Sequence, residues 1–516
     1  MNLIQFKAWK SNIVLLLIGA CISYSTLSHA HTRPSLTVHT RSGDIRGKAT
    51  EHTDTWQGIP YATPPVGALR WRATQPPHPW KGVKNTTAFG PACWQTPPKQ
   101  GPESALRHQT MSEDCLTLNI WKPKRVFEEQ SLPVMVWIHG GGFRLGSSSM
   151  PLYNGANLAQ KGVIVVSMNY RLGAFGVFPQ RKLSQAQPNQ PMNFGIMDQI
   201  QALRWIHNNI AAFGGNPDNV TIWGESAGGA SVGYLLTSPL SKGLFNKAII
   251  ESGALSLLDK SRHQAIKAFE QALPSTINNM SPAALRKLPA KTLLHLPINK
   301  TSTMPIVDGR SITHSTRNAL QTGKIHHIPL LIGSNNDEAQ FFPPAWSEQM
   351  KDKLGSMWPY ALSLTDGYGT QQEHLKAVQL ATDVFATLPT RQFAQTTAML
   401  GIPTWRYYFT YQSTADHRHH VGAIHTSEIP YVFGNLDQLS YTPTMEDKEL
   451  ADNLMERWVH FAKHGNPDPI GFAHWPQYTP YEKTLWQISH DGERAIKERG
   501  LVRLDWLAQQ KNLSIQ

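Results

Sequence analysis

Short apolar runs recur along the chain, and each of them ends in glycine or in residues that favour turns. Continuous apolar runs of this length are typical of strands that are buried on both faces of a sheet. The predicted strands are residues 134–138, 163–167, 220–223, 247–250, 329–332, 405–411 and 484–488.

Amphipathic helices are predicted between these strands, because residues 196–210 and 450–464 place apolar side chains at three- and four-residue spacing. The alternation predicts an α/β protein whose mostly parallel sheet is flanked by helices on both sides. Ligands bind such sheets beyond the carboxyl ends of the strands, and the glycine-rich segments fall at those ends. Residues 261–322 and 341–400 have helical patterns without strong strands, and we expect helical insertions over the active site.

Residues 1–30 have the pattern of a secretory signal peptide, with a positive start, a short apolar run and a small-x-small site at Ala30. We therefore expect cleavage near Ala30, a secreted or periplasmic location, and a mature chain of residues 31–516 that forms one domain. A second interpretation is a lipoprotein, because residues 18–21 resemble a lipidation box that would place a lipid on Cys21. No other segment is apolar enough to span a membrane.

The balance of charge is basic. The formal net charge is +12, and it becomes +10 when Lys7 and Lys10 are removed with the signal segment. A basic surface can attract anionic partners. The Lys and Arg residues are dispersed, however, and no nucleic-acid-binding motif is present. We expect a solvated basic surface and no nucleic-acid partner.

The chain has three cysteines, and removal of Cys21 with the signal segment leaves Cys93 and Cys115. An even number of cysteines in an oxidising compartment favours a disulfide over two free buried thiols. The bond would close a loop of about 22 residues, worth roughly 3 kcal/mol on the chain-entropy model.

The strongest chemical signal is Gly224-Glu225-Ser226-Ala227-Gly228, which fits the G-x-S-x-G pattern of a nucleophile elbow. A strand is predicted to end at Trp223 and a helix to begin near Ala227, so Ser226 would lie on the sharp turn between them. Flanking glycines suit such a turn, because neighbouring backbones approach closely there. The alternative is an ordinary strand-to-helix turn that is capped by a serine.

A second signal is the glycine run of residues 139–143, which follows the strand 134–138. Such a run exposes backbone N–H groups that can form an oxyanion hole, and each donor is typically worth roughly 2.7–4 kcal/mol. The candidate donors are Gly141, Gly142 and Ala227. Read alone, the run could also be a tight turn or a weak phosphate loop. Its spacing does not fit G-x-G-x-x-G, and no Walker lysine follows.

A nucleophilic serine needs a base and an orienting carboxylate, which follow in the chain order Ser, acid, His in this type of sheet. The acid should follow a later strand, where Asp337 and Glu338 stand. The best-placed base is His425, which follows the predicted strand 405–411. Rival histidines are His417, His419 and His420. Their tract could bind a metal, but it lacks ligand spacing from other segments and reads better as a polar loop.

Six ordered segments together resemble the carboxylesterase type B family, which includes cholinesterases and bacterial carboxylesterases. The segments are residues 57–67, 112–119, 137–143, 169–176, 213–217 with 220–229, and 425–434. The resemblance runs from about Ser42 to the Leu501 region. It implies an α/β-hydrolase fold and a Ser226–His425–Glu338 triad. It also implies oxyanion-hole donors at Gly141, Gly142 and Ala227.

The resemblance further implies three cross-links, which are the Cys93–Cys115 disulfide and the ion pairs Arg70–Glu113 and Arg171–Asp198. Two features depart from the family pattern. Ala339 stands where a glycine often follows the acid, and the loop between the two cysteines is shorter than in cholinesterases. There is no reason to expect choline specificity.

The predicted reaction is hydrolysis of a small-molecule ester through an acyl-enzyme, without a metal or organic cofactor. Because the base is a neutral imidazole, activity should fall at acidic pH. Rival interpretations are a non-catalytic binding protein, a triglyceride lipase, and a peptidase or amidase. The intact triad argues against the first, and a lipase would need a large exposed apolar rim. The candidate walls of the acyl pocket are Phe341, Phe342, Trp346 and Trp358.

Overall fold

The computed structural model describes residues 36–124, 131–254, 260–301, 304–366, 372–416 and 422–510. The predicted signal segment lies outside these ranges, as do His417, His419 and His420. From Leu36 onward the chain forms one compact unit. In the part of the chain that is described, no helix is both long and apolar enough to cross a membrane.

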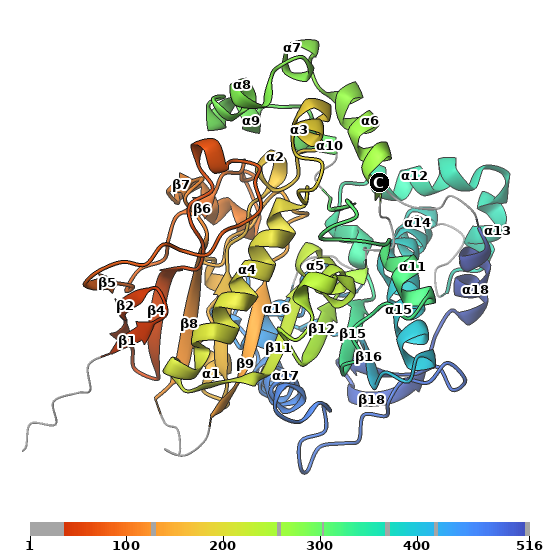
Figure 1. Ribbon diagram of the computed structural model, residues 1–516. Helices are drawn as coiled ribbons and strands as arrows, with labels where there is room; N and C mark the ends of the chain where they lie inside the picture. The colour runs from red at the N-terminus through yellow and green to blue at the C-terminus, as the bar shows by residue number, and fades with distance from the viewer. Residues whose placement is uncertain are drawn as a thin grey trace, which may run out of the picture. The chain divides into compact units, whose positions relative to one another are not determined.

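An eleven-stranded sheet forms the centre of this unit, in the order β18-β17-β16-β15-β12-β11-β9-β10-β8-β4-β3 (Figure 1). The strands from β10 to β17 pair in parallel, and antiparallel pairs complete both edges. The bounds are β3 (Lys48–Ala49), β4 (Thr53–Pro60), β8 (Thr117–Pro123), β9 (Leu132–Ile138), β10 (Ile164–Met168), β11 (Gly215–Glu225), β12 (Lys247–Glu251), β15 (Leu330–Asn335), β16 (Thr404–Phe409), β17 (Thr484–Ser489) and β18 (Gly492–Lys497). All seven predicted strands are therefore confirmed.

The middle of the sheet is buried on both faces, as its continuous apolar sequence predicted. In β9, Val134 and Val136 belong to one apolar core, whereas Met135 and Trp137 belong to another. Because side chains alternate along a strand, the two cores lie on opposite faces of the sheet.

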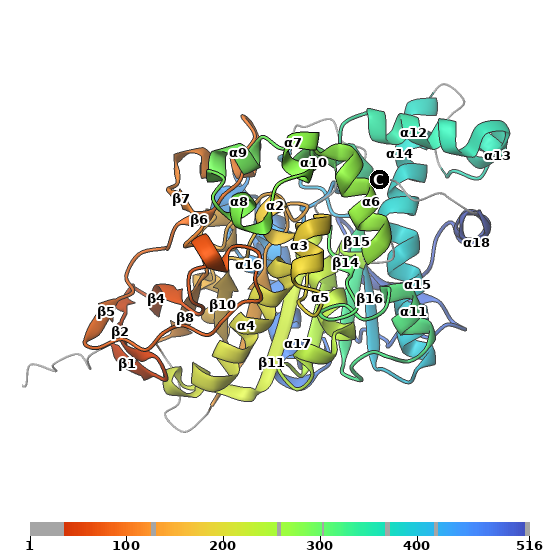
Figure 2. The same cartoon turned by 45° about the horizontal axis from the view of Figure 1, so that its top comes forward.

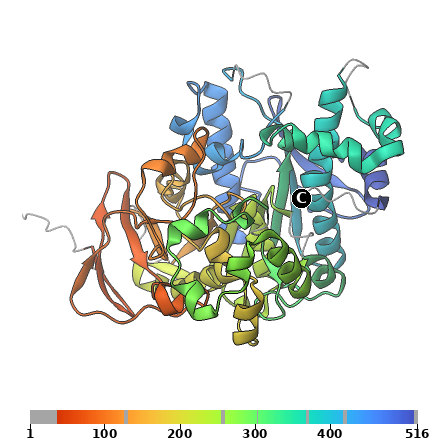
Figure 3. The same ribbon diagram turned by 90° about the horizontal axis from the view of Figure 1, so that it is seen from above.

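Helices from distant parts of the chain line the two cores. α4 (Phe194–Asn209) and α5 (Ala227–Thr237) contribute to the first core, and α17 (Met445–His464) contributes to the second. Figures 1 and 3 show α17 on the side of the sheet opposite α4. The two amphipathic helices predicted at residues 196–210 and 450–464 are thus confirmed.

The two segments predicted as insertions are helical, and Figure 2 shows their first helices gathered toward one end of the sheet. The first segment forms α6 (Arg262–Ala272), α7 (Ser275–Asn278), α8 (Pro282–Arg286), α9 (Ala290–Leu294), α10 (Ile298–Thr301) and α11 (Thr316–Gln321). The second forms α12 (Ala345–Leu354), α13 (Trp358–Ser363), α14 (Glu373–Thr382), the π-helical turn η9 (Asp383–Thr387) and α15 (Leu388–Met399).

Shorter elements complete the described part of the chain. The remaining helices are α1 (Ala156–Ala159), α2 (Gly173–Gly176), α3 (Arg181–Ala186), α16 (Ile429–Phe433) and α18 (Leu501–Gln509). The remaining strands are β1 (Thr37–Thr40), β2 (Gly43–Arg46), β5 (Val83–Asn85), β6 (Ala92–Cys93), β7 (Met111–Ser112), β13 (Lys260–Ser261) and β14 (Ile306–Val307).

Candidate active site

Ser226 lies on the sharp turn between β11 and α5, as the motif predicted. Its φ is 57° and its ψ is −121°, a conformation that a residue with a side chain rarely adopts. Its backbone N–H donates a 2.9 Å hydrogen bond to the carbonyl of Glu251, which holds the turn against β12. A Cβ on Gly224 or Gly228 would lie 2.5 Å or 1.9 Å from the carbonyl oxygen of Ile138. Both motif glycines are therefore needed for the close approach of β9.

The glycine run after β9 lies beside this turn. Gly141 has a φ of 98° and Gly142 a φ of 62°, so both residues use backbone conformations that favour glycine. The hydroxyl of Tyr170 donates a 2.7 Å hydrogen bond to the carbonyl of His139, and the two rings stack. Within the described ranges, the N–H groups of Gly141 and Ala227 donate no hydrogen bond. These two donors can therefore serve an incoming oxygen atom.

Glu338, and not Asp337, contacts the predicted base. Its Oε2 lies 2.5 Å from Nδ1 of His425, and its Oε1 accepts a 2.8 Å hydrogen bond from the backbone N–H of Asn335. Glu338 begins the 3-10 turn η7 (Glu338–Phe341) directly after β15, and it is fully buried. The following Ala339 does not have a positive φ, so the alanine fits where the family often has glycine.

The other ring nitrogen of His425 faces a second carboxylate. Its Nε2 lies 3.0 Å from Oε1 of Glu225, the residue that precedes Ser226. Among the described residues, the Ser226 hydroxyl makes no hydrogen bond. The structure thus brings Glu338 and His425 into contact and places His425 at the end of β11. Glu225 lies next to Nε2, the ring nitrogen that would accept the proton of Ser226.

Three buried glutamates act on His425, a fourth lies close to two of them, and three of the four were not predicted as site residues. They are Glu225, Glu251, Glu338 and Glu428. The sequence signal that could have identified Glu225, Glu251 and Glu428 is an acidic residue at the end of a buried apolar strand or in an otherwise apolar segment. Glu225 and Glu251 are direct neighbours on β11 and β12. Asn335 donates to Glu428 at 2.6 Å, and Trp458 donates to Glu251 at 2.6 Å.

These carboxylates change the acid–base properties of the site. Burial lowers the pKa of His425, but the charges of Glu225 and Glu338 outweigh burial and raise the pKa to about 9. Burial raises the pKa of the Glu225 carboxyl well above its usual range, and it raises that of Glu428 to about 7. The pair of His425 and Glu225 therefore holds a proton at neutral pH.

Aromatic rings pack against the imidazole of His425. The ring centroids of Phe341, Phe342 and Phe385 lie 5.4, 5.3 and 5.7 Å from that of His425. Trp346 stacks on Phe342 at 4.2 Å. Three of the four predicted wall residues therefore gather near His425. Phe385 was missed, because nothing in its local sequence distinguishes it from a core residue.

The fourth predicted wall residue, Trp358, is buried among the helices of the second insertion. Its indole Nε1 donates a 2.9 Å hydrogen bond to Glu373.

A cavity of about 450 Å³ lies next to the loop that carries His425. Ile424 and Thr426, the two neighbours of His425 in the chain, contribute to its lining, together with Tyr411 and Tyr431. A volume of this size is within the range of small-molecule sites.

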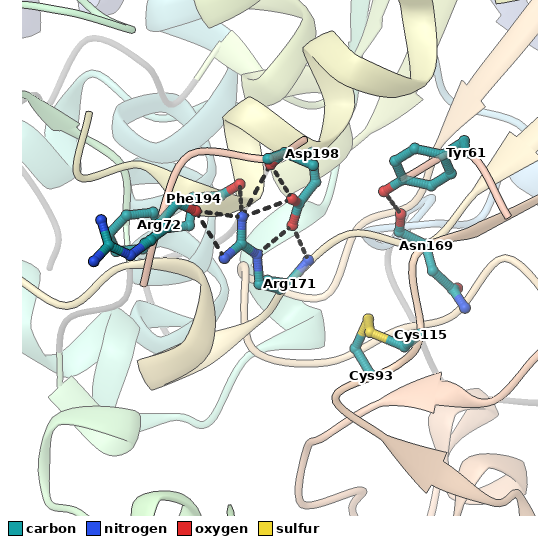
Figure 4. A network of polar contacts seen from close by, with 9 residues as sticks. Tyr61, Arg72, Cys93, Cys115, Asn169, Arg171, Phe194 and Asp198 are labelled. Atoms are coloured by element: carbon teal, nitrogen blue, oxygen red, sulfur yellow. Dashed lines mark hydrogen bonds and ion pairs between the residues drawn. A yellow bond between two sulfur atoms is a disulfide. The ribbon is translucent and has the colours of Figure 1, made fainter. Parts of the chain in front are cut away.

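The predicted cross-links brace the segments around the site. Figure 4 shows the guanidinium of Arg171 against the carboxylate of Asp198, with two contacts of 2.8 Å between them. Arg171 also donates to the backbone carbonyls of Arg72 and Phe194. The second predicted pair is formed by Arg70 and Glu113 at 2.5 Å, and the disulfide joins Cys93 to Cys115.

Comparison with known proteins identifies the family. The model of the carboxylesterase family matches residues 34–503. The para-nitrobenzyl esterase of Bacillus subtilis is 37% identical over 483 residues, which cover 89% of this chain and 96% of the relative. The fumonisin B1 esterase of Sphingopyxis macrogoltabida is 37% identical over 476 residues, covering 86% and 85%. Mouse cholinesterase is 31% identical, covering 92% and 86%.

Solved structures agree as well. A thermophilic PNB esterase superposes with a TM-score of 0.80 at 33% identity, covering 92% of this chain and 100% of that one. A carboxylesterase of Geobacillus stearothermophilus gives 0.78 at 33% identity, with the same coverage. The sheet and its covering helices are those of an α/β-hydrolase. The chain belongs to the carboxylesterase family, and it is a carboxylic ester hydrolase.

Proposed function

We propose that the protein hydrolyses small-molecule carboxylic esters through a Ser226–His425–Glu338 triad and an acyl-enzyme. The observation that carries the proposal is the 2.5 Å contact between His425 Nδ1 and Glu338 Oε2, with Nε2 turned toward the strand end that bears Ser226. A carboxylate at Nδ1 fixes the tautomer and stabilises the imidazolium that forms when the base takes a proton.

The reaction has two half-steps. The Ser226 oxygen forms a bond to the ester carbonyl carbon while Nε2 of His425 takes the hydroxyl proton. The carbonyl oxygen becomes negative, and the N–H groups of Gly141, Gly142 and Ala227 stabilise it. The C–O bond then breaks, and the alcohol leaves with the proton from His425. Water attacks the acyl-enzyme by the same route and releases the acid.

Glu225 also takes part in this scheme. Its carboxylate occupies the position next to Nε2 in the free enzyme, so the imidazole must shift from Glu225 to the Ser226 hydroxyl before proton transfer. Catalytic hydrogen bonds are often long in a free enzyme and tighten only in its substrate complex.

Short acyl chains are the proposed preference. Rings of Phe342, Trp346 and Phe385 pack against one another beside His425. We infer that they form the wall of the acyl pocket and limit the depth available to a chain. Two relatives are named for different esters, para-nitrobenzyl esters and fumonisin B1, so family membership does not fix the alcohol part of the substrate.

Export from the cytoplasm is also proposed, with residues 1–30 as a signal peptide that is cleaved near Ala30. The Cys93–Cys115 disulfide supports an oxidising compartment. Attachment of a lipid to Cys21 is the alternative. The mass of the protein recovered from its natural host separates the two, because only the lipoprotein keeps Cys21 and gains the mass of acyl chains.

The triad is tested with a Ser226→Ala variant and p-nitrophenyl acetate, butyrate and palmitate as substrates. We expect turnover of the short esters that falls on the order of 10⁶-fold in the variant. The matched control is Ser238→Ala, which makes the same change at the far end of α5 and should stay within a few-fold of wild type. Equal turnover by Ser226→Ala and wild type would refute the proposal. Preferred hydrolysis of palmitate would indicate a lipase.

A further inference from the structure

The π-helical turn η9 brings one helix of the second insertion into contact with the acid–base pair. It interrupts the otherwise continuous helix of α14 and α15 between Asp383 and Thr387. Such turns are rare inside α-helices and are frequent at functional sites. Phe385 extends from the turn toward His425, with 5.7 Å between ring centroids. Directly before the turn, the Thr382 hydroxyl accepts a 3.0 Å hydrogen bond from the N–H of Ala339.

The turn therefore contacts His425 directly, and Thr382, just before it, contacts the residue that follows Glu338. Phe385 packs on the imidazole itself and on Phe342, at 4.9 Å. Thr382 fixes the residue that follows Glu338, and so fixes the start of the turn that presents the carboxylate. A displacement of η9 would move the acyl-side wall and the orienting acid together.

A buried ion pair anchors this turn from the far end of the chain. The Nε of Arg503, on α18, donates a 2.5 Å hydrogen bond to Oδ2 of Asp383. Both side chains are about 5% exposed. Arg503 also donates to the carbonyl of Leu364 at 3.0 Å and to Asp366 at 2.9 Å. The guanidinium thus ties η9 to the segment that follows α13.

α18 is also attached to α15. Asp505 accepts a 2.6 Å hydrogen bond from Arg391 on α15, and Arg391 also contacts Glu498. The side chain of Asp505 is 53% exposed. Arg391 lies on α15 beyond η9, and Glu498 also pairs with Arg406 on β16. Among the described residues, neither Asp505 nor Glu498 hydrogen-bonds to η9, His425 or Glu338. Figures 1 and 2 show α18 beside the helices of the second insertion.

We propose that Arg503 is a positioning residue for catalysis and acyl-chain selection. Through Asp383 it holds η9 in place, and η9 in turn holds Phe385 against His425 and Thr382 against the turn of Glu338. The last helix of the described chain is in this way part of the substrate-selecting structure. The inference rests on the proposed function of Glu338 and His425.

The decisive measurement is a ratio. The kcat/KM for p-nitrophenyl hexanoate divided by that for the acetate does not depend on how much of a preparation is folded. An Arg503→Leu variant releases η9, so the aromatic wall gives way and the pocket deepens. We expect the ratio to rise on the order of 10-fold, because a displacement of about 1 Å near the reacting groups changes rates by up to about 10²-fold.

Two further variants keep the test interpretable if Arg503→Leu folds poorly. Arg503→Lys retains a charge for Asp383 but cannot reproduce the planar fork that also reaches Leu364, and it should give an intermediate ratio. The double variant of Arg503→Leu with Asp383→Asn removes the unpaired buried charge and should keep the raised ratio. Asp505→Asn, on the same helix, is the matched control and should leave the ratio unchanged.

Phe385 supplies an independent check. Phe385→Ala should raise the same ratio, and combining it with Arg503→Leu should add little, because the two residues act on one wall. Phe393→Ala truncates the same side chain on α15, where it faces the sheet core, and it should lower both rate constants equally or not at all.

The outcomes separate the two proposals. An unchanged ratio in Arg503→Leu, or the same rise in Asp505→Asn, would refute the positioning role while leaving the triad intact. Hydrolysis that survives Ser226→Ala would refute the proposed function itself, whatever the ratio shows.

Discussion

The carboxylate of Glu225 lies 3.0 Å from Nε2 of His425, while Glu338 is hydrogen-bonded to Nδ1 of the same ring. An imidazole between two carboxylates is favoured in its protonated form, which is why the pKa of His425 is raised to about 9 despite burial. A protonated imidazole cannot accept a proton from serine. The free enzyme is therefore more active when the pH rises through this pKa.

A Glu225→Gln variant should shift this pH dependence. Removal of the charge at Nε2 takes away the largest of the effects that raise the pKa of His425, so that pKa falls. We expect the acid limb of the plot of kcat/KM against pH to move to lower pH by about one to three pH units. The variant would then gain activity relative to wild type as the pH is lowered.

The measurement is kcat/KM for p-nitrophenyl acetate from pH 5 to pH 10, in buffers of constant ionic strength. Glu348→Gln is the matched control, because this glutamate is exposed on α12 and should not move the limb. An acid limb at the same pH in Glu225→Gln and wild type would show that Glu225 does not set the charge of His425.

The acid of the triad is tested by Glu338→Gln. The amide can still fill the space and contact Nδ1, but it has no charge with which to stabilise the imidazolium. On the precedent of the same change in other serine triads, kcat should fall by about 10⁴-fold. Steady-state turnover of p-nitrophenyl acetate measures this. Asp337→Asn, one residue earlier, distinguishes the two acids, and a larger loss there would reassign the triad.

Most of the sheet could be predicted from sequence, because it leaves strong local signals. The contact of Glu338 with His425 followed from the family resemblance, since the local sequence left Asp337 and Glu338 both open as the acid. The central strands are continuous apolar runs, and the elbow has its glycines. The antiparallel edge was not predicted. β8 carries Thr117, Asn119 and Lys122 among its apolar residues, and Asn119 is buried only because Ser148 and Ser167 share its hydrogen bonds.

The missed parts of the site depend on tertiary contact. Glu225 occupies a position that the nucleophile motif leaves open, so its contact with Nε2 follows only from the turn geometry of the folded chain. Phe385 approaches His425 because a helix contains a π-helical turn, and Arg503 reaches that turn from more than a hundred residues further along. Periodicity along the sequence carries no information about such a turn.

Loss of one partner from the ion pair of Arg171 and Asp198 should strongly destabilise the fold. Both side chains are at most 4% exposed, so replacing the acid leaves a buried charge without its partner. Asp198→Asn should lower the free energy of unfolding by about 3–5 kcal/mol. Urea unfolding monitored by tryptophan fluorescence measures it. The control is Asp452→Asn, because the Asp452 side chain is 63% exposed in its pair with Lys161, and a change below about 1 kcal/mol is expected there.

The disulfide offers a comparison that needs no change of sequence. It closes a loop with a sequence separation of 22 residues, and its reduction should cost about 3 kcal/mol of unfolding free energy on the chain-entropy model. Reduced and oxidised wild type have identical side chains, so the difference in their urea midpoints isolates the bond. The double variant Cys93→Ser, Cys115→Ser should unfold near the reduced protein. Equal midpoints for oxidised and reduced protein would show that the loop is held by Arg70 and Glu113 without the bond.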